Sequence, residues 1–480
     1  MSVQINQHPL YNELPVGQEV MFAVTQNTIV ATEFNVKFIA KVYISDTFIN
    51  FTADQHVGDF KTTPNNVGAG IFNFRPVIET FVSPDNQGFK ETPYGGTTLA
   101  GSTYKTSILT HPIHLIDKFS LNKTSVRYMA IQFVIESSAG ADSIIEIHED
   151  EMVNSDKYIL FNGVLQYDDV LTQLAVSGAV HNAIGYNLKA NNFIPFSGGS
   201  QDKCLSNAPK TQYARLTDYG TLPFLQMMPD FNDEVIRFDL KYYDSSDSLL
   251  DAETILNEAA NGGTDLYTQH SAVNLEYFGA FPANLRGWSS AFEALVTAGT
   301  DIAYYTVRPI TVFSQGITPY TINIICPNER GYEGIRLTWL NQWGAWDYYT
   351  FNMKSTKSVT TNKVSWTQLG GTWNENAYRV SGYKGGKKNF RVNATEKIKI
   401  NTDFVSEAEG VWFEELINSP EVYIVNEYST DIDINTITNK YIEPVRLTTS
   451  NYIKKTIAND RLMQYTIEIE KSKTKRTQAV

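Results

Sequence analysis

The sequence predicts a mainly β protein with several antiparallel β-sandwich-like domains followed by a C-terminal α+β domain. Short runs of alternating apolar and polar residues recur along the chain, and clusters of Gly, Pro, Asn and Asp separate them. Aromatic residues make up 12% of the chain and charged residues only 19%, a balance that suits pleated, half-buried surfaces. Because 480 residues exceed what one hydrophobic core usually fills, several domains are expected.

Five segments show the period of two that a strand requires. They are residues 36–44, 129–135, 236–242, 320–324 and 463–469. Helical patterns are fewer. Residues Ser406 to Asn418 place apolar side chains at helical spacing, with Ser406 or Asp403 as the cap and Pro420 as the stop, and a strand follows at 421–425. A second helix is predicted over 251–260, before a Gly-Gly pair.

A tryptophan hairpin is predicted at residues 335–353, with the sequence IRLTWLNQWGAWDYYTFNM. Its two strands flank a turn at Gly344. Its large rings favour packing in the core, or else an exposed platform for a glycan or another protein. The candidate platform residues are Trp339, Trp343, Trp346 and Tyr348.

The chain is divided into three predicted domains. Residues 1–205 form an N-terminal β-domain, and residues 206–328 form a second β-domain with a short helix. Residues 329–480 form a C-terminal α+β domain that contains the tryptophan hairpin, and Pro327-Asn328 marks the break before it. The last ten residues are predicted to be a polar tail.

Composition excludes several classes of function. The net charge of −13 argues against a general nucleic-acid binder, which needs a cationic surface. Two cysteines, Cys204 and Cys326, cannot make a disulfide scaffold or a cysteine zinc site, and buried free thiols are expected. The first twenty residues lack the pattern of a signal peptide, and no apolar run is long enough to span a membrane.

Motifs for catalysis or cofactor binding are missing from the sequence. It contains no Gly-x-Ser-x-Gly nucleophile elbow and no phosphate-binding Gly-x-x-x-x-Gly-Lys motif. His111 and His114 are spaced for opposite faces of a strand, and the acidic run 146–151 lacks the pattern of a calcium loop. We therefore predict no catalytic residue, no metal ligand and no cofactor. Dispersed carboxylates of a polysaccharide-degrading enzyme stay open as an alternative.

Two basic segments stand out in this acidic chain. One contains Lys471, Lys473, Lys475 and Arg476 near residue 480, and the other has the sequence YKGGKKNFR at residues 383–391. Its cations are Lys384, Lys387, Lys388 and Arg391. They fit an ordinary hairpin loop, or an electrostatic docking site for an acidic neighbouring protein.

Six stretches of sequence carry a resemblance. They are HPLYNELPVGQEVMFAV (8–24), FNVKFIAKVYISD (34–46), GDFKTTPNNVGAGIFNFRPVIETFVSPDN (58–86), RLTWLNQWGAWDYYTFNMKS (336–355), residues 402–425, and PVRLTTSNYIKKTIANDRLMQYTIEIE (444–470). Together they resemble large uncharacterised virion structural proteins, associated with the tail, baseplate or neck, of tailed bacteriophages of marine bacteria and Bacteroidetes. None of these stretches is a catalytic signature, so the resemblance assigns no functional residue.

The resemblance implies a structural protein of a bacteriophage virion, most plausibly at the tail, baseplate or neck. Such a protein is made in the host cytoplasm and assembles with itself, as a ring or trimer, and with other virion proteins. The alternative is a carbohydrate- or receptor-binding virion protein that binds a host surface glycan. Neither function calls for a membrane or a specific nucleic acid.

Overall fold

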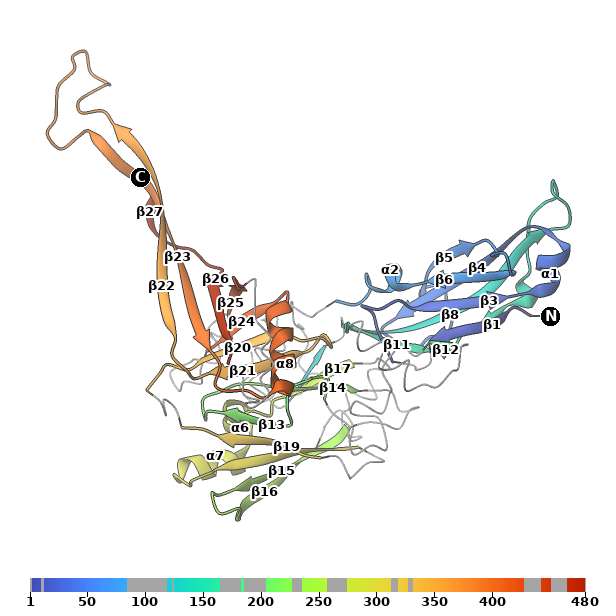
Figure 1. Cartoon of the computed structure of the whole chain (residues 1–480), viewed down its shortest axis with the longest axis horizontal. Helices are drawn as coiled ribbons and strands as arrows, with labels where there is room; N and C mark the ends of the chain where they lie inside the picture. The colour runs from blue at the N-terminus through green and yellow to red at the C-terminus, as the bar shows by residue number, and fades with distance from the viewer. Residues whose placement is uncertain are drawn as a thin grey trace. The chain divides into compact units, whose positions relative to one another are not determined.

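The computed structural model describes most of the chain, and the strands predominate in it (Figure 1). The described residues are 2–9, 13–83, 119–122, 125–164, 183–184, 204–226, 235–256, 274–311, 318–326, 331–426, 442–449 and 464–479. The predicted fold class is confirmed, since the protein is mainly β with several sheets and a small helical part near the C-terminus.

Contacts divide the chain into two compact units. The first unit holds residues 1–325, 340–347 and 427–438, and the second holds residues 326–339, 348–426 and 439–480. The change of unit after Ile325 lies near the predicted break at Pro327-Asn328. The predicted division at residue 205 stays a prediction. Among the described residues, no helix is long and apolar enough to cross a bilayer.

Two sheets of the first unit pack against a shared hydrophobic core. One has the order β12-β1-β3-β6, and the other has the order β2-β11-β8-β4-β5, with β9 and β10 also paired to β8. The strands are β1 (Gln4–Pro9), β2 (Glu13–Pro15), β3 (Met21–Thr25), β4 (Phe34–Ser45), β5 (His56–Thr62), β6 (Ala69–Asn73), β8 (Val126–Ser138), β9 (Glu146–Ile147), β10 (Val153–Asn154), β11 (Tyr158–Phe161) and β12 (Ala183–Ile184). Phe22 of β3 contacts Phe133 of β8 and Tyr158 of β11, so rings from both sheets meet in this core.

Three short helices accompany these sheets. They are α1 (Asn27–Thr32), α2 (Arg75–Ile78) and the 3-10 helix η2 (Glu149–Glu151). The side chain of Gln26 caps α1 by accepting a hydrogen bond from the backbone N–H of Ile29, 2.9 Å away. This cap satisfies one of the donors that a helix start leaves open.

The first unit contains a second core, formed by two further sheets and two helices. The sheet orders are β13-β19-β18-β15-β16 and β14-β17-β7. The elements are β7 (Phe119–Asn122), β13 (Thr211–Ala214), β14 (Leu222–Gln226), β15 (Val235–Tyr243), β16 (Leu249–Leu256), β17 (Asn274–Phe278), β18 (Tyr304–Thr311), β19 (Tyr320–Ile324), α6 (Pro282–Trp288) and α7 (Ser290–Thr297). Phe238 and Phe278 stack with ring centroids 4.0 Å apart, which joins the two sheets through their side chains.

The helix predicted over 251–260 is wrong for its described part. Residues Leu249–Leu256 form β16, an edge strand that pairs with its neighbour β15 along its length, and residues 257–260 lie outside the described part of the chain. The edge of β15 offers backbone hydrogen bonds to this segment. Such tertiary pairing outweighs a weak intrinsic helix preference.

The second unit consists of one large sheet and one helix of the described residues. The sheet order is β21-β20-β24-β25-β26-β23-β22, and β27 pairs with β23. The elements are β20 (Ile335–Leu340), β21 (Trp346–Phe351), β22 (Thr356–Gln368), β23 (Gly386–Asn401), α8 (Glu407–Asn418), β24 (Val422–Val425), β25 (Ile442–Leu447), β26 (Thr466–Lys471) and β27 (Lys475–Ala479). Both the predicted helix and the strand that follows it are confirmed.

Helix α8 begins where the sequence predicted. The hydroxyl of Ser406 accepts a hydrogen bond from the backbone N–H of Glu409, and the Glu409 carboxylate accepts one from the backbone N–H of Ser406. This reciprocal pair is a capping box, which satisfies two donors at the helix start.

The C-terminal segment departs from its prediction as a loose tail. Lys475–Ala479 form β27, paired with β23 at Arg391, Asn393 and Ala394. Strand β23 continues past its pairing with β26 and so presents an open edge, which the end of the chain occupies.

Candidate functional site

A long exposed feature of the second unit is a β-arm. We define the arm as residues 356–391, which comprise β22, the connection 369–385 and the first residues of β23. The two strands pair from Thr356 opposite Lys399 to Gln368 opposite Gly386. In Figure 1 these strands extend beyond the others of their sheet.

Pairing along the arm is one-sided. Strand β22 is the last strand of its sheet, so its outer edge has no partner strand among the described residues. The other edge of β23 pairs with β26 over 397–401 and with β27 over 391–394. From residue 390 toward the tip, the arm is therefore a two-stranded ribbon.

Local sequence explains how the arm forms. Strand β22 is rich in Thr and Val, which favour extended backbone. A register shift between Val364 and Ser365 places a bulge in the ribbon, which increases its twist. Gly385 and Gly386 take φ values of +97° and +77° where the chain re-enters β23, and side chains rarely tolerate these angles.

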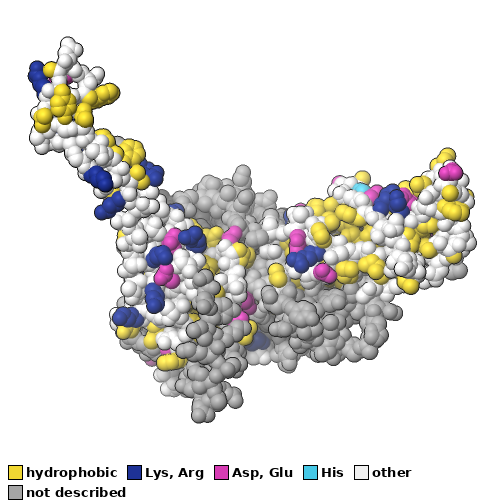
Figure 2. Space-filling model, turned by 45° about the horizontal axis from the view of Figure 1, so that its top comes forward, with side chains coloured by type: hydrophobic (Ala, Val, Ile, Leu, Met, Phe, Trp, Pro, Cys, Tyr) yellow, Lys and Arg dark blue, Asp and Glu magenta, His cyan; other side chains and the backbone are white. Residues whose placement is uncertain are grey.

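Apolar side chains cover the arm although it lacks a core of its own. At the tip Trp373 exposes 85% of its surface, and Val380 and Tyr383 expose 80% each. The other large exposed apolar residues of the arm are Val359, Val364, Trp366, Leu369, Tyr378 and Phe390. Figure 2 shows hydrophobic side chains gathered at its end. Contiguous exposed apolar surface of this kind marks an interaction site.

The four predicted docking cations all lie on this arm. Lys384 lies in the connection, with its Nζ 5.8 Å from the ring centroid of Tyr383, and Lys387, Lys388 and Arg391 lie on β23. In the strand register, Lys388 faces Trp366. Neighbouring side chains on a ribbon interact, so the arm presents charge and aromatic surface together.

The arm also has an unusual charge balance. It contains seven Lys and Arg residues and one acidic residue, a net charge of +6 within a chain of net charge −13. Lys357 pairs with Glu333 at 2.6 Å. The remaining six cations have no ion-pair partner among the described residues. The structure therefore gathers the predicted cations into a larger basic and aromatic surface.

No protein-family model matches the chain, and a search of curated proteins found no significant match. Function must therefore be argued from the residues themselves.

The tryptophan hairpin lies in the core. Strands β20 and β21 are neighbours in the sheet, as predicted, and Trp339, Trp343, Trp346 and Tyr348 are all buried. Trp339 packs against Trp412 of α8, with ring centroids 5.0 Å apart. Packing against this helix is the core interpretation that the sequence favoured. Buried rings present no face to a glycan, so the candidate platform is internal in this structure.

The exposed aromatic residues of the arm were missed by sequence reasoning. They are Trp366, Trp373, Tyr378, Tyr383 and Phe390 of the arm. A signal existed in the sequence for three of these rings, because Trp373, Tyr378 and Tyr383 lie between two Gly-Gly pairs, at 370–371 and 385–386, in a stretch that also contains two Asn residues and Gly382. Loops of that composition lie on the surface, so rings within them are exposed.

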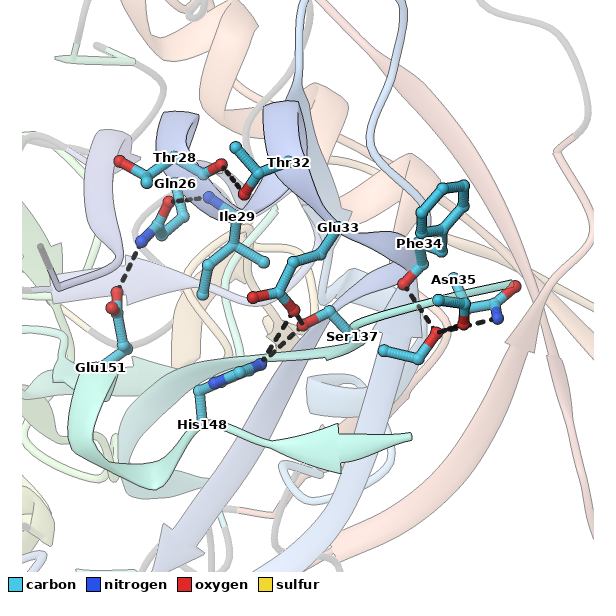
Figure 3. A network of polar contacts seen from close by, with 12 residues as sticks. Gln26, Thr28, Ile29, Thr32, Glu33, Phe34, Asn35, Ser137, His148 and Glu151 are labelled. Atoms are coloured by element: carbon cyan, nitrogen blue, oxygen red, sulfur yellow. Dashed lines mark hydrogen bonds and ion pairs between the residues drawn. The ribbon is translucent and has the colours of Figure 1, made fainter. Parts of the chain in front are cut away.

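A Ser–His–Glu group occurs in the first unit but lacks the geometry of a catalytic relay (Figure 3). Ser137 donates a hydrogen bond to the Glu33 carboxylate, and its Oγ lies 2.6 Å from Nε2 of His148. The same Nε2 lies 3.6 Å from Glu33. In a relay the acid binds the imidazole nitrogen opposite the one that takes the serine proton. Here the Glu33 carboxylate accepts the hydrogen bond from the Ser137 hydroxyl directly, so His148 is not positioned as the base.

This group instead ties local elements together. Glu33 is the C-cap of α1, Ser137 is the penultimate residue of β8, and His148 is the N-cap of η2. Gln26, at the other end of α1, donates a hydrogen bond to Glu151 at 2.7 Å. Polar contacts at both ends of α1 therefore fix this helix against the segment that contains η2 (Figure 3).

The two cysteine thiols differ in their exposure to solvent. Cys204 is buried, as predicted, and burial raises the pKa of its thiol to about 12. Cys326 is exposed, contrary to the prediction. No group of three or more His, Cys, Asp or Glu side chains suited to a metal occurs among the described residues, and His111 and His114 lie outside them.

Proposed function

We propose that this protein is a structural component of a tailed-bacteriophage virion, at the tail, baseplate or neck. In this proposal it assembles with itself as a ring or trimer and docks other virion proteins. The proposal builds on the resemblance inferred from six stretches of the sequence, and on an arm in the described chain that is suited to binding protein.

The arm is the observation that carries the proposal. Twelve consecutive residues of β22, from Thr356 to Thr367, are exposed, and large rings are exposed at the tip. A two-stranded ribbon is marginally stable in water by itself. A long, partly apolar edge strand also invites uncontrolled pairing unless a partner covers it. An assembled particle supplies such a partner for every copy.

Carbohydrate binding at the tryptophan hairpin is not proposed. That alternative depended on Trp339, Trp343, Trp346 and Tyr348, and all four are buried. A polysaccharide-degrading activity would use a pair of carboxylates and not a serine relay, so the Ser137, His148 and Glu33 group does not bear on that alternative.

Two measurements test the proposal. Mass spectrometry of purified particles of the encoding phage should detect the protein, and an antibody to it should label one station in micrographs. Light scattering over a wide concentration range should give a mass of several subunits. A protein that stays monomeric at every concentration and is absent from the particles would contradict the proposal.

A further inference from the structure

A second exposed surface of the chain complements the arm in charge. We name it the acidic segment and define it as residues 142–152, which contain β9 and η2. It holds five acidic residues and no Lys or Arg. Apolar side chains are also exposed there, with Ile144 exposing 85% of its surface and Ile145, Ile147 and Met152 exposing smaller fractions. The acidic segment, like the arm, combines a predominant sign of charge with exposed apolar residues.

Three carboxylates of the acidic segment make no hydrogen bond or ion pair among the described residues. They are the exposed side-chain groups of Asp142, Glu146 and Asp150. By contrast, Glu149 pairs with Lys41 at 2.7 Å, and Glu151 accepts a hydrogen bond from Gln26. Three negative charges therefore remain for an external partner.

Another acidic region, the turn between β15 and β16, is less suitable. Asp244 accepts hydrogen bonds from the backbone N–H groups of Ser246 and Ser248, each 2.8 Å long. Asp247 accepts a hydrogen bond from the hydroxyl of Tyr304 at 2.9 Å. Because these carboxylates already accept hydrogen bonds within their own chain, they are less available to bind a partner than those of the acidic segment.

The arm supplies the opposite set of groups. Six of its cations lack an ion-pair partner among the described residues, and exposed rings lie beside them. The six are Lys363, Arg379, Lys384, Lys387, Lys388 and Arg391. Complementary charge steers two surfaces together and fixes their register, while apolar contact supplies the burial that holds them.

We propose that the arm of one copy docks on the acidic segment of a second copy. This inference rests on the self-assembly in the proposed function and names the surfaces that perform it. The arm and the acidic segment are different surfaces of one chain, so the contact is heterologous. Repeated head-to-tail contacts of this kind close into a ring when the rotation permits it.

A second copy fits the arm better than nucleic acid does. Interleaved cations and rings also occur on surfaces that bind single-stranded DNA. However, apart from the arm the chain is strongly acidic, since only one of its 52 Asp and Glu residues lies on the arm. A nucleic acid approaching the arm would meet this repulsion, whereas another copy offers carboxylates and apolar side chains together.

Cross-linking of the unmodified chain tests the contact directly. Equal amounts of ordinary and ¹⁵N-labelled protein are mixed and treated with a carbodiimide, which joins a lysine to a carboxylate that touches it. We expect links from Lys387 or Lys388 to Glu146 or Asp150 in which one peptide is labelled and the other is not. Links confined to peptides of one isotope would place the contact within a chain and overturn the proposal, as would no links.

Charge reversal tests the same contact by affinity. Lys387→Glu with Lys388→Glu should weaken self-association about tenfold, and so should Glu146→Lys with Asp150→Lys, because each reversal replaces attraction with repulsion. Combining all four changes in one chain should restore association. The control is Lys241→Glu, an exposed lysine of β15 outside both surfaces, which should leave association unchanged. Circular dichroism checks that each variant is folded.

The outcomes separate this inference from the proposed function. If the protein is in the particles and self-associates but neither reversal changes its affinity, the docking fails and the structural role stands. If the reversed arm loses binding to a fluorescent single-stranded DNA that the wild type binds, and self-association is unchanged, the arm is a nucleic-acid surface and the docking is overturned. Weakening by each reversal and recovery in the combined variant supports the docking.

Discussion

Gly344 shows how one residue fixes the turn of the tryptophan hairpin. Its φ is +73°, and a Cβ placed on it would overlap the carbonyl oxygen of Asn162. Asn341 completes the turn, because its side-chain oxygen accepts hydrogen bonds from the backbone N–H groups of Trp343 and Ala345, each 3.0 Å long. The turn therefore needs both a left-handed backbone and a residue without a side chain.

Replacing Gly344 by alanine should destabilise the protein by about 2–4 kcal/mol, since left-handed strain and a backbone clash combine. The matched control is Gly299→Ala. Its φ of +69° carries the same strain, but no atom lies within 4 Å of the added Cβ, so about 1 kcal/mol is expected. Urea unfolding measures both. Equal losses in the two variants would show that Asn162 does not crowd the turn.

The two cysteine residues should differ sharply in reactivity. Cys204 is buried and its thiol pKa is raised to about 12 by burial, so little thiolate forms at pH 8. Cys326 is exposed and open to reagent. A colorimetric thiol titration of the native protein at pH 8 should therefore count one reactive thiol, and unfolding in guanidinium should reveal the second. Cys326→Ser should abolish the native reaction. Rapid modification of Cys204 in the folded chain would contradict its burial.

At the scale of elements, the periodicity of the sequence predicted the strands and the helix correctly wherever contacts with distant residues did not change the local preference. The strand segments near residues 36, 129, 236 and 320 and the helix after Ser406 all form, because alternation and capping are local signals. The segment at 249–256 is a strand, because it pairs with β15, and this pairing cannot be read from the residues of the segment itself. Strand β27 was not predicted for the same reason, since it forms by pairing with β23, which is distant in sequence.

The candidate site, too, could be predicted only in part from the sequence. The cations of residues 384–391 could be singled out because charge is visible in the sequence. Burial is not visible, so the rings of the hairpin at 339–348 and those of the arm could not be told apart by composition. Trp343 and Trp373 both lie near glycines in turns, yet only Trp373 is exposed, because Trp343 lies in a turn that packs inside the first unit. Exposure depends on partners distant in sequence.

Pairing of β27 with β23 should depend on acidity. A hydrogen bond from Lys475, 2.6 Å long, lowers the pKa of Glu396, and a hydrogen bond from Lys397 lowers that of Glu468 on β26. A lowered folded pKa contributes stability that is present above the ordinary value near 4.5 and is lost as pH falls through the folded value. The edge of the sheet should therefore loosen in acid.

Hydrogen exchange, corrected for the intrinsic rate at each pH, measures this loosening. Protection of the amides in Lys475–Ala479 should fall between pH 6 and pH 3, while that of central strand β8 should persist. The variant Glu396→Gln should show weak protection of β27 already at pH 6 and little further change in acid. Protection of β27 that is equal at both pH values in the wild type would rule out this role for Glu396.

For the whole molecule, the division into two units predicts two separate unfolding events. Each unit has hydrophobic contacts of its own, with Phe238 and Phe278 stacked in the first and Trp339, Trp412 and Phe413 clustered in the second. The chain passes from the second unit into the first and back through the hairpin turn at 340–347. Units with separate cores commonly unfold as separate cooperative blocks.

Calorimetry with one core variant per unit tests this independence. Trp412→Ala removes a buried ring from the second unit and should cost about 3–5 kcal/mol there, which lowers one thermal transition. Phe238→Ala removes a buried ring from the first unit at a similar cost and should lower the other transition. Because the turn at 340–347 links the units, a small shift of the second transition in each variant is compatible with the division. A single transition that moves equally in both variants would mean that the two units unfold as one. The sheet that carries the arm would then unfold only together with the first unit.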